Sequence, residues 1–163
     1  MVVHDTERKL ATIVSIDAAG YSRQSEIDEP AAIQEVRALR ARLNASAESH
    51  GGRMFSSAGD GFMLEFVSVS GAIAFIDEVF ATGRLPLRAG VHIGEVTVTG
   101  DGDLLGRGVN IAARLRALAD TGEAIVSGEV RRALPTAVAT RLIARGTPKL
   151  AKMEERVDAF ALA

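Results

Sequence analysis

The sequence has no cysteine and no tryptophan, and only one tyrosine, in 163 residues. The absence of cysteine excludes disulfide scaffolds, cysteine-ligated zinc sites and thiolate catalysis. No run approaches 18 consecutive apolar residues, so we expect no membrane span. The N-terminal segment 1–9 is polar and lacks the apolar core of a signal peptide. These absences together predict a soluble, cytoplasmic protein.

An excess of either charge is also missing. The 19 Lys and Arg residues oppose 21 Asp and Glu residues, which gives a formal net charge of −2. A surface that coats nucleic acid is therefore excluded, and we expect no nucleic-acid partner. The 47% apolar and 25% charged residues are typical of a globular protein, and the length fits a single domain over 1–163.

Apolar periodicity predicts strands and helices that alternate. The run 10–16 is nearly all apolar, as is typical of a strand covered on both faces. A helix is expected to begin near Asp28, with Pro30 in its first turn, and to end at His50. Its apolar stripe, expected to face a core, comprises Ile33, Val36, Leu39, Leu43 and Ala47.

The following elements complete a ferredoxin-like order. Two strands joined by a tight turn, then a helix that starts after Ser68 and stops at Gly83, and then a long strand give β-α-β-β-α-β. The expected strands span 53–57, 62–66 and 87–98. A third helix over about 106–119, with Ile111, Leu115 and Leu118 as its apolar stripe, opens a C-terminal α/β extension. This extension is expected to contain strands over 124–127, 140–144 and 156–162 and a short helix over 129–134. The predicted fold class is α+β.

Two carboxylates are the first candidate site residues. Asp17 ends the first strand, and Asp60 lies at the tip of the hairpin, which a ferredoxin-like sheet places beside that strand. Carboxylates that converge at one sheet end suit Mg²⁺ or Mn²⁺, which prefer oxygen ligands. The alternative is that Asp60 only satisfies a tight turn and that Asp17 caps a loop.

Two further patterns could serve a phosphorylated ligand. The small-residue turn Ala18-Ala19-Gly20-Tyr21-Ser22 could present backbone amides to phosphate oxygens, although it is not a P-loop. Asn110 and Arg114 are four residues apart on one helix face, where they could bind a sugar hydroxyl and a charged phosphoryl group. Alternatively, this pair is simply part of a solvated polar face.

These segments, together with Gly51-Gly52-Arg53, Gly59-Asp60-Gly61-Phe62 and the helix Gly106 to Arg114, occur in an order that resembles a known family. The chain resembles the catalytic domain of class III adenylate and guanylate cyclases in its compact bacterial form. The strand over 87–96 looks like the strand before the family's dimerisation arm, and its His92 is expected to be a packed residue rather than a ligand.

The resemblance implies a homodimer with active sites across the interface. Asp17 and Asp60 of one subunit would hold two Mg²⁺ or Mn²⁺ ions, and the backbone of 18–21 would bind the β- and γ-phosphates of ATP. Asn110 of the other subunit would orient the ribose, and its Arg114 would stabilise charge at the α-phosphate. The 3′-hydroxyl would attack that phosphorus in line to form 3′,5′-cyclic AMP and pyrophosphate.

Base recognition departs from the family in part. The family's base-binding Asp has a counterpart in Asp103, whose carboxylate can accept from the exocyclic amine of adenine and would oppose the carbonyl of guanine. The family's base-binding Lys corresponds to Ser56, a shorter and uncharged donor. ATP is therefore the expected substrate, with GTP less favoured.

The second departure concerns a lysine that meets the triphosphate. In strict register its position in the late loop is occupied by Ala151, and Lys149 or Lys152 replaces it only if the loop shifts. Both departures leave open a degenerate cyclase-like domain with little or no activity, which acts as a nucleotide-binding, dimerisation or regulatory module. Family members often carry this module beside sensor domains, so regulatory domains in a longer parent protein are a further expectation.

Overall fold

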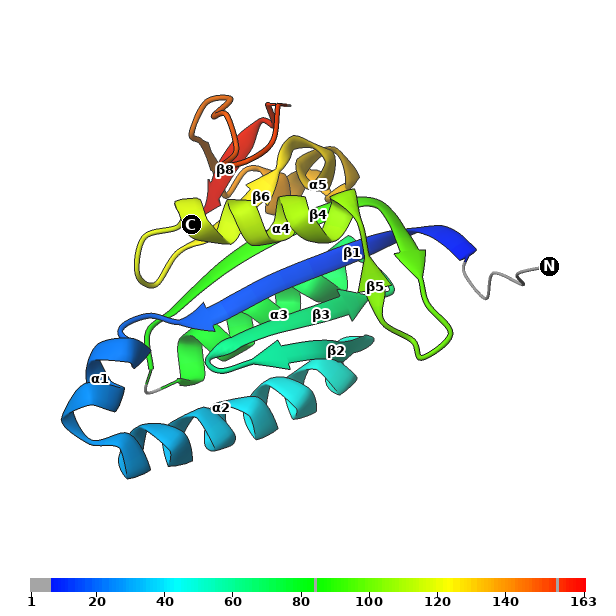
Figure 1. The fold of residues 1–163 in the computed structure, drawn as a ribbon. Coiled ribbons are helices and arrows are strands. Elements are labelled where there is room, and N and C mark those ends of the chain that lie inside the picture. The colour runs from blue at the N-terminus through cyan, green and yellow to red at the C-terminus, as the bar shows by residue number, and fades with distance from the viewer. Residues whose placement is uncertain (1–6, 84, 155) are drawn as a thin grey trace.

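The computed structural model describes residues 7–83, 85–154 and 156–163. Within these residues one sheet has the strand order β2-β3-β1-β4-β6-β8-β7, and β5 pairs with β4 (Figure 1). The strands are β1 (Glu7–Ala18), β2 (Gly52–Ala58), β3 (Gly61–Phe66), β4 (Leu87–Val98), β5 (Leu104–Leu105), β6 (Ala124–Ser127), β7 (Leu142–Ala144) and β8 (Ala159–Leu162). The helices are α1 (Tyr21–Ile27), α2 (Glu29–Ser49), α3 (Val69–Thr82), α4 (Arg107–Leu118), α5 (Gly128–Ala133) and α6 (Thr136–Ala139).

The first half of the chain confirms the ferredoxin-like prediction. Strands β1, β2, β3 and β4 are antiparallel neighbours in the order β2-β3-β1-β4, with α2 and α3 as the connections. The C-terminal part adds β6 parallel to β4, then β8 antiparallel to β6, and then β7 antiparallel to β8. The predicted α+β class and the C-terminal extension are therefore confirmed. No described helix combines the length and the apolar character needed to cross a membrane.

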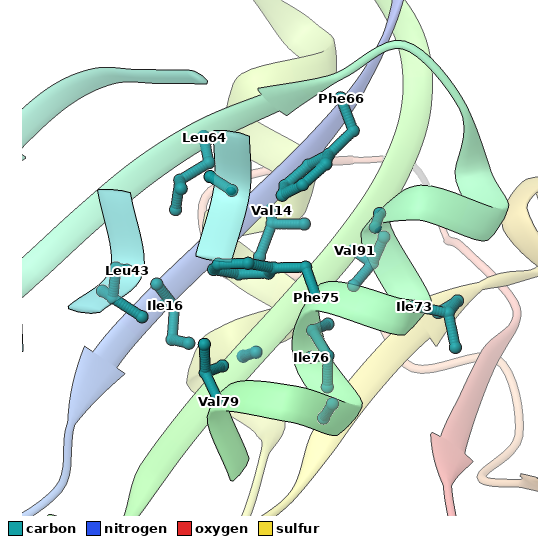
Figure 2. Packing of buried hydrophobic residues seen from close by; sticks show 14 of the residues in the cluster. Val14, Ile16, Leu43, Leu64, Phe66, Ile73, Phe75, Ile76, Val79 and Val91 are labelled. Atoms are coloured by element: carbon teal, nitrogen blue, oxygen red, sulfur yellow. The ribbon is translucent and has the colours of Figure 1, made fainter. Parts of the chain in front are cut away.

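Helices cover the two faces of the sheet unequally. Helices α2 and α3 pack against one face over a core in which Phe75 of α3 lies against Phe66 of β3, with ring centroids 4.9 Å apart (Figure 2). On the opposite face α4 crosses β4 and β1, with Ile111 and Ala112 buried beneath it (Figure 1). Because α4 lies over the centre of the sheet, it can bring side chains to the end of β1.

Three apolar side chains predicted to be buried are exposed instead. Leu10 is 68% exposed because β1 pairs with β3 only from Thr12 onward, so Leu10 lies beyond the end of β3. Ile33 is 39% exposed because the 21-residue α2 is longer than the strands that it covers and its first turns project past them. Leu118 is 41% exposed as the last residue of α4.

Short elements were also absent from the sequence prediction. Helix α1 begins at Tyr21, inside the segment interpreted as a turn, and β5 and α6 were not expected. Each spans seven residues or fewer, so periodicity gives little signal for them.

The close approach of α4 to the sheet depends on Gly90 of β4. A β-carbon at this position would lie 2.2 Å from the backbone oxygen of Ala112 and 2.3 Å from the backbone nitrogen of Arg116. Both atoms belong to the α4 backbone, which cannot turn aside as a flexible side chain can. Glycine at this position therefore sets the distance between α4 and β4.

We predict that Gly90→Ala lowers the free energy of unfolding by about 1–3 kcal/mol, the usual cost of overpacking, because α4 must move off the sheet. Urea denaturation followed by circular dichroism measures this loss. Gly61→Ala is the matched control, since its added β-carbon would meet Ala58 O at 3.4 Å. Equal stability of parent and Gly90→Ala would contradict the packing argument.

Candidate active site

Asp17 and Asp60 lie at the same end of the sheet. Asp17 is opposite Gly61 in the pairing of β1 with β3, and the amide of Ala18 donates to Asp60 O at 3.2 Å. Both carboxylates line a pocket of about 430 Å³ at this end. The remaining lining residues are Ala18, Ala19, Gly20, Tyr21, Ser22, Arg88 and Thr121.

A larger hollow of about 590 Å³ lies at the other end of β1. Its acidic residue, Glu65, already pairs with Lys9 at 2.7 Å and with Arg53 at 2.9 Å. The smaller pocket is the better candidate because it combines two neighbouring carboxylates with the small-residue loop.

The Asp17 carboxylate is held by two arginines. Arg88, directly opposite on β4, donates from Nε to Oδ1 at 3.1 Å and from Nη2 to Oδ2 at 2.7 Å. Arg116 of α4 brings Nε to 3.4 Å from Oδ2, and its Nη1 donates to Ser15 Oγ at 2.9 Å. Asp17 is only 8% exposed, so these partners stabilise a carboxylate that water barely reaches.

Asp60 is less buried and has a different electrostatic environment. Burial raises the pKa of the Asp60 carboxyl above its ordinary value, and the negative charge of Asp17 raises it further. Its own backbone hydrogen bond and the positive charges of Arg116 and Arg88 lower the pKa of Asp60 in the opposite direction. Two like charges and two arginines therefore lie close enough to influence one another.

The carboxylates fit a cation that arrives with a phosphorylated ligand. In the part of the chain that the structure describes, no group of three or more histidine, cysteine or acidic residues could hold a metal ion. Mg²⁺ commonly takes one or two carboxylates and fills its other positions with phosphate oxygens and water. Asp17 and Asp60 suit this mode of binding better than a metal site built from protein alone.

Fewer backbone amides of residues 18–21 are free to bind phosphate than the sequence predicts. The amide of Ala18 donates to Asp60 O, and that of Ala19 donates to Pro86 O at 2.8 Å. The amides of Tyr21 and Ser22 open α1, where the helix itself supplies no acceptor. Gly20 precedes them with φ 79°, a left-handed conformation that favours glycine. The amides at 20–22 are thus the better phosphate donors.

Asn110 and Arg114 lie on α4 but do not line the pocket of their own chain. Asn110 is exposed, and Arg114 is half-buried with no hydrogen-bond partner for its buried Nε among the described residues. The structure therefore places this pair apart from Asp17 and Asp60.

Ser56 and Asp103 lie on different elements. A bulge in β2 between Met54 and Ser56 sets Ser56 opposite Met63, on the face of the sheet that carries Asp17. The carboxylate of Asp103 accepts from the amide of Leu104 at 2.8 Å in the loop before β5.

Arg53 connects these two elements. Its Nη2 donates to Gly102 O at 2.8 Å, which ties the loop that carries Asp103 to β2. Ser56 and Asp103 can therefore lie along one surface.

The two late lysines are far from the carboxylates in the strand order. The backbone of Lys149 forms an isolated antiparallel β-bridge with that of Arg156, and the side chains of Lys149 and Lys152 are exposed. They belong to the segment between β7 and β8, whereas Asp17 lies on β1. Neither lines the pocket.

His92 is buried on β4, in agreement with the expectation of a packed residue. It is 3% exposed, and its Nδ1 lies 2.8 Å from Ser127 Oγ, which also accepts from the amide of Val130. Desolvation lowers the pKa of His92 to about 4, because the attraction of Glu129 is too weak to offset burial. The imidazole is therefore neutral at pH 7, and the Ser127 hydroxyl can donate a hydrogen bond to its Nδ1.

Sequence reasoning missed Arg88 and Arg116. Pairing the strand over 10–16 antiparallel with the strand over 87–98 would have placed Arg88 opposite Asp17. Arg116 gives no comparable signal, because its role depends on how α4 lies over β1.

Comparison with known proteins finds relatives in sequence and in structure. No family model matches the chain. It is 38% identical over 139 residues to the Rhizobium meliloti (strain 1021) protein named "Putative adenylate cyclase 3", which covers 78% of this chain and 24% of that protein. An uncharacterized Mycobacterium tuberculosis (strain ATCC 25618 / H37Rv) protein is 29% identical over 168 residues, which cover 99% of this chain and 43% of that protein. The chain thus spans less than half the length of these relatives.

Solved structures share the fold of this protein over nearly the whole chain. An adenylate/guanylate cyclase/hydrolase from Silicibacter pomeroyi has a TM-score of 0.85 at 27% identity, with 97% of this chain and 98% of that chain covered. The adenylyl cyclase CyaB from P. aeruginosa has a TM-score of 0.84 at 22% identity, with 97% and 95% covered. At that identity the second likeness concerns the fold alone.

We predict that protonation of His92 makes the protein less stable in mild acid. The unfolded chain binds this proton below a pKa of 6.5 and the folded chain only below about 4, so stability is full above pH 6.5 and falls as the pH drops through this window. The difference corresponds to about 3 kcal/mol between pH 7 and pH 4. Urea denaturation at several pH values measures the slope, and His92→Gln should reduce it. An NMR titration that places the pKa of His92 near 6.5 would contradict the prediction.

Proposed function

Because the chain has the fold of class III adenylate and guanylate cyclase catalytic domains and resembles them in sequence, we propose that it converts ATP to 3′,5′-cyclic AMP and pyrophosphate. Residues 1–163 would form one catalytic domain. The observation that carries this proposal is the convergence of Asp17 and Asp60 beside the start of α1, in one pocket. Carboxylates next to free amides suit a nucleoside triphosphate that brings divalent cations.

Residues of this chain would bind the cations and the phosphates of the nucleotide. Asp17 and Asp60 would hold two Mg²⁺ or Mn²⁺ ions, and these cations would lower the pKa of the ribose 3′-hydroxyl and neutralise the leaving pyrophosphate. The amides at 20–22 would bind phosphate oxygens. A bond would form between the 3′-oxygen and the α-phosphorus, and the bond from that phosphorus to the β-phosphate bridging oxygen would break.

The remaining groups would come from a second copy of the chain. Asn110 and Arg114 lie outside the pocket of their own chain, so a homodimer would be needed to bring them to the α-phosphate and ribose. Arg114 is half-buried, and its guanidinium would supply a charged donor to a phosphoryl oxygen.

Adenine recognition is the finer part of the proposal. Asp103 offers an acceptor that suits the exocyclic amine of adenine, and Ser56 offers a short donor from the face of the sheet that carries Asp17. The name of the Rhizobium meliloti relative, an adenylate cyclase, supports ATP over GTP. Because the chain spans only part of its relatives, further domains in a longer protein would supply regulation.

We predict that the protein forms cyclic AMP from ATP with Mn²⁺, and that Asp17→Asn and Asp60→Asn each lower the rate by roughly a hundredfold or more through loss of electrostatic stabilisation. Chromatography of reactions with ATP and with GTP measures the product. Glu48→Gln, an exposed carboxylate change on α2, is the matched control and should retain activity.

Absence of product from both nucleotides, while a nonhydrolysable ATP analogue still binds, would contradict the enzyme proposal. That result would instead favour the degenerate nucleotide-binding module.

We predict that two inactive variants restore activity when mixed. Arg114→Ala removes the arginine that a subunit would contribute to the site of its partner. Asp17→Asn removes the metal-binding carboxylate of the subunit's own site. A mixed dimer keeps one intact site, so a 1:1 mixture that exchanges subunits should recover roughly a quarter of the parent rate, as expected for random pairing in a symmetric dimer. No recovery in a mixture shown by sedimentation to contain mixed dimers would contradict a shared site.

A further inference from the structure

Arg116 of α4 contacts two residues of β1, Ser15 and Asp17. Its Nη1 donates to Ser15 Oγ at 2.9 Å, and its Nε lies 3.4 Å from Asp17 Oδ2 but makes no hydrogen bond there. That Nε is buried and has no hydrogen-bond partner among the described residues. A guanidinium donor without an acceptor is costly. Arg116 does not itself line the pocket, but it contacts Asp17, which does.

Arg116 is held less firmly than Arg88. Arg88 makes hydrogen bonds to both Asp17 oxygens, whereas Arg116 approaches only Oδ2 and out of line. When a cation takes over the Asp17 carboxylate, Arg116 loses the weaker of the two attachments to Asp17 and keeps its hydrogen bond to Ser15. Of the two arginines, Arg116 is therefore the one that a cation displaces from Asp17 more easily.

Two carboxylates and two arginines lie at this end of the sheet, so their charges cancel. Asp17 and Asp60 oppose Arg88 and Arg116, so the four side chains are neutral together. A nucleoside triphosphate with two divalent cations is also neutral, so the loaded site stays balanced only while both arginines remain. Removal of Arg116 leaves a net negative charge near the phosphates, which disfavours the nucleotide and favours a free cation.

Other cations of the same chain do not fill this role. Lys149 and Lys152 are exposed in the segment between β7 and β8, and neither pairs with Asp17 among the described residues, whereas Arg116 does. Arg114 is two residues from Arg116, which places it roughly 200° around the helix and away from Asp17.

We propose that Arg116 is an exchangeable counter-ion of Asp17: it pairs with this carboxylate in the cation-free site and transfers to the phosphates of an incoming metal–nucleoside triphosphate. This inference rests on the proposed function. Arg116 is thus a positioning residue in the free protein and a phosphate ligand in the loaded one. One consequence is that free Mn²⁺ binds weakly until nucleotide is present, because the cation must compete with Arg116.

The test compares Arg116→Gln with the parent in two binding measurements. Titration with Mn²⁺ alone, followed by electron paramagnetic resonance, should show roughly tenfold tighter binding in Arg116→Gln, since a competing charge is gone. Calorimetry with β,γ-methylene-ATP at saturating Mn²⁺ should show roughly tenfold weaker binding, since a charged phosphate contact is lost. The matching AMP complex should bind both proteins equally.

Two controls separate this role from a structural one. Arg40→Gln removes the same charge from an exposed position of α2, on the other face of the sheet, and should change neither affinity. Arg116→Lys keeps the charge and should restore most of the triphosphate affinity. A merely structural Arg116 would weaken both ligands together in Arg116→Gln.

The outcomes distinguish the inference from the proposed function. If the parent binds the triphosphate analogue and Arg116→Gln binds it as tightly, or binds Mn²⁺ no better, the counter-ion exchange is wrong and the proposed function stands. If the parent binds no triphosphate analogue with Mn²⁺, both are overturned.

Discussion

The Asp17 carboxylate joins three parts of the molecule at one point. It ends the central strand β1, lies opposite Arg88 of β4 and is approached by Arg116 of α4. A carboxylate that is only 8% exposed would be strongly destabilising without partners, so the fold depends on these arginines whether or not a ligand is present. The same charges that make the sheet end stable therefore also determine what can bind there.

The sequence predicted the positions that repeat or pair locally. The convergence of Asp17 and Asp60 followed from the element order alone, because adjacent strands in a ferredoxin-like sheet bring their ends together. The buried stripe of α2 was correct at Leu39 and Leu43 but wrong at Ile33, since periodicity does not reveal where a helix outruns its sheet. Backbone hydrogen bonds at Ala18 and Ala19 were likewise invisible, because their acceptors lie in distant segments.

The near-neutral composition conceals how charge is distributed. The sequence shows Ser56 and Ala151 where the related family places lysines, which suggests a site poor in positive charge. The structure instead has two arginines beside Asp17, and neither was identified from sequence because each is defined by a contact across more than 70 positions. Counting charges by motif position therefore underestimates the positive potential of this pocket.

Helix α4 carries arginines that point in nearly opposite directions. Arg116 faces Asp17 of its own chain, and Arg114 lies roughly 200° away around the helix, so it faces away from that pocket. In a dimer with shared sites, one helix would therefore touch two pockets at once. Gly90 holds the backbone of this helix against β4, so α4 cannot shift at one pocket without moving at the other. A shift of α4 would therefore be felt at both sites of such a dimer, because this helix would carry groups for each of them.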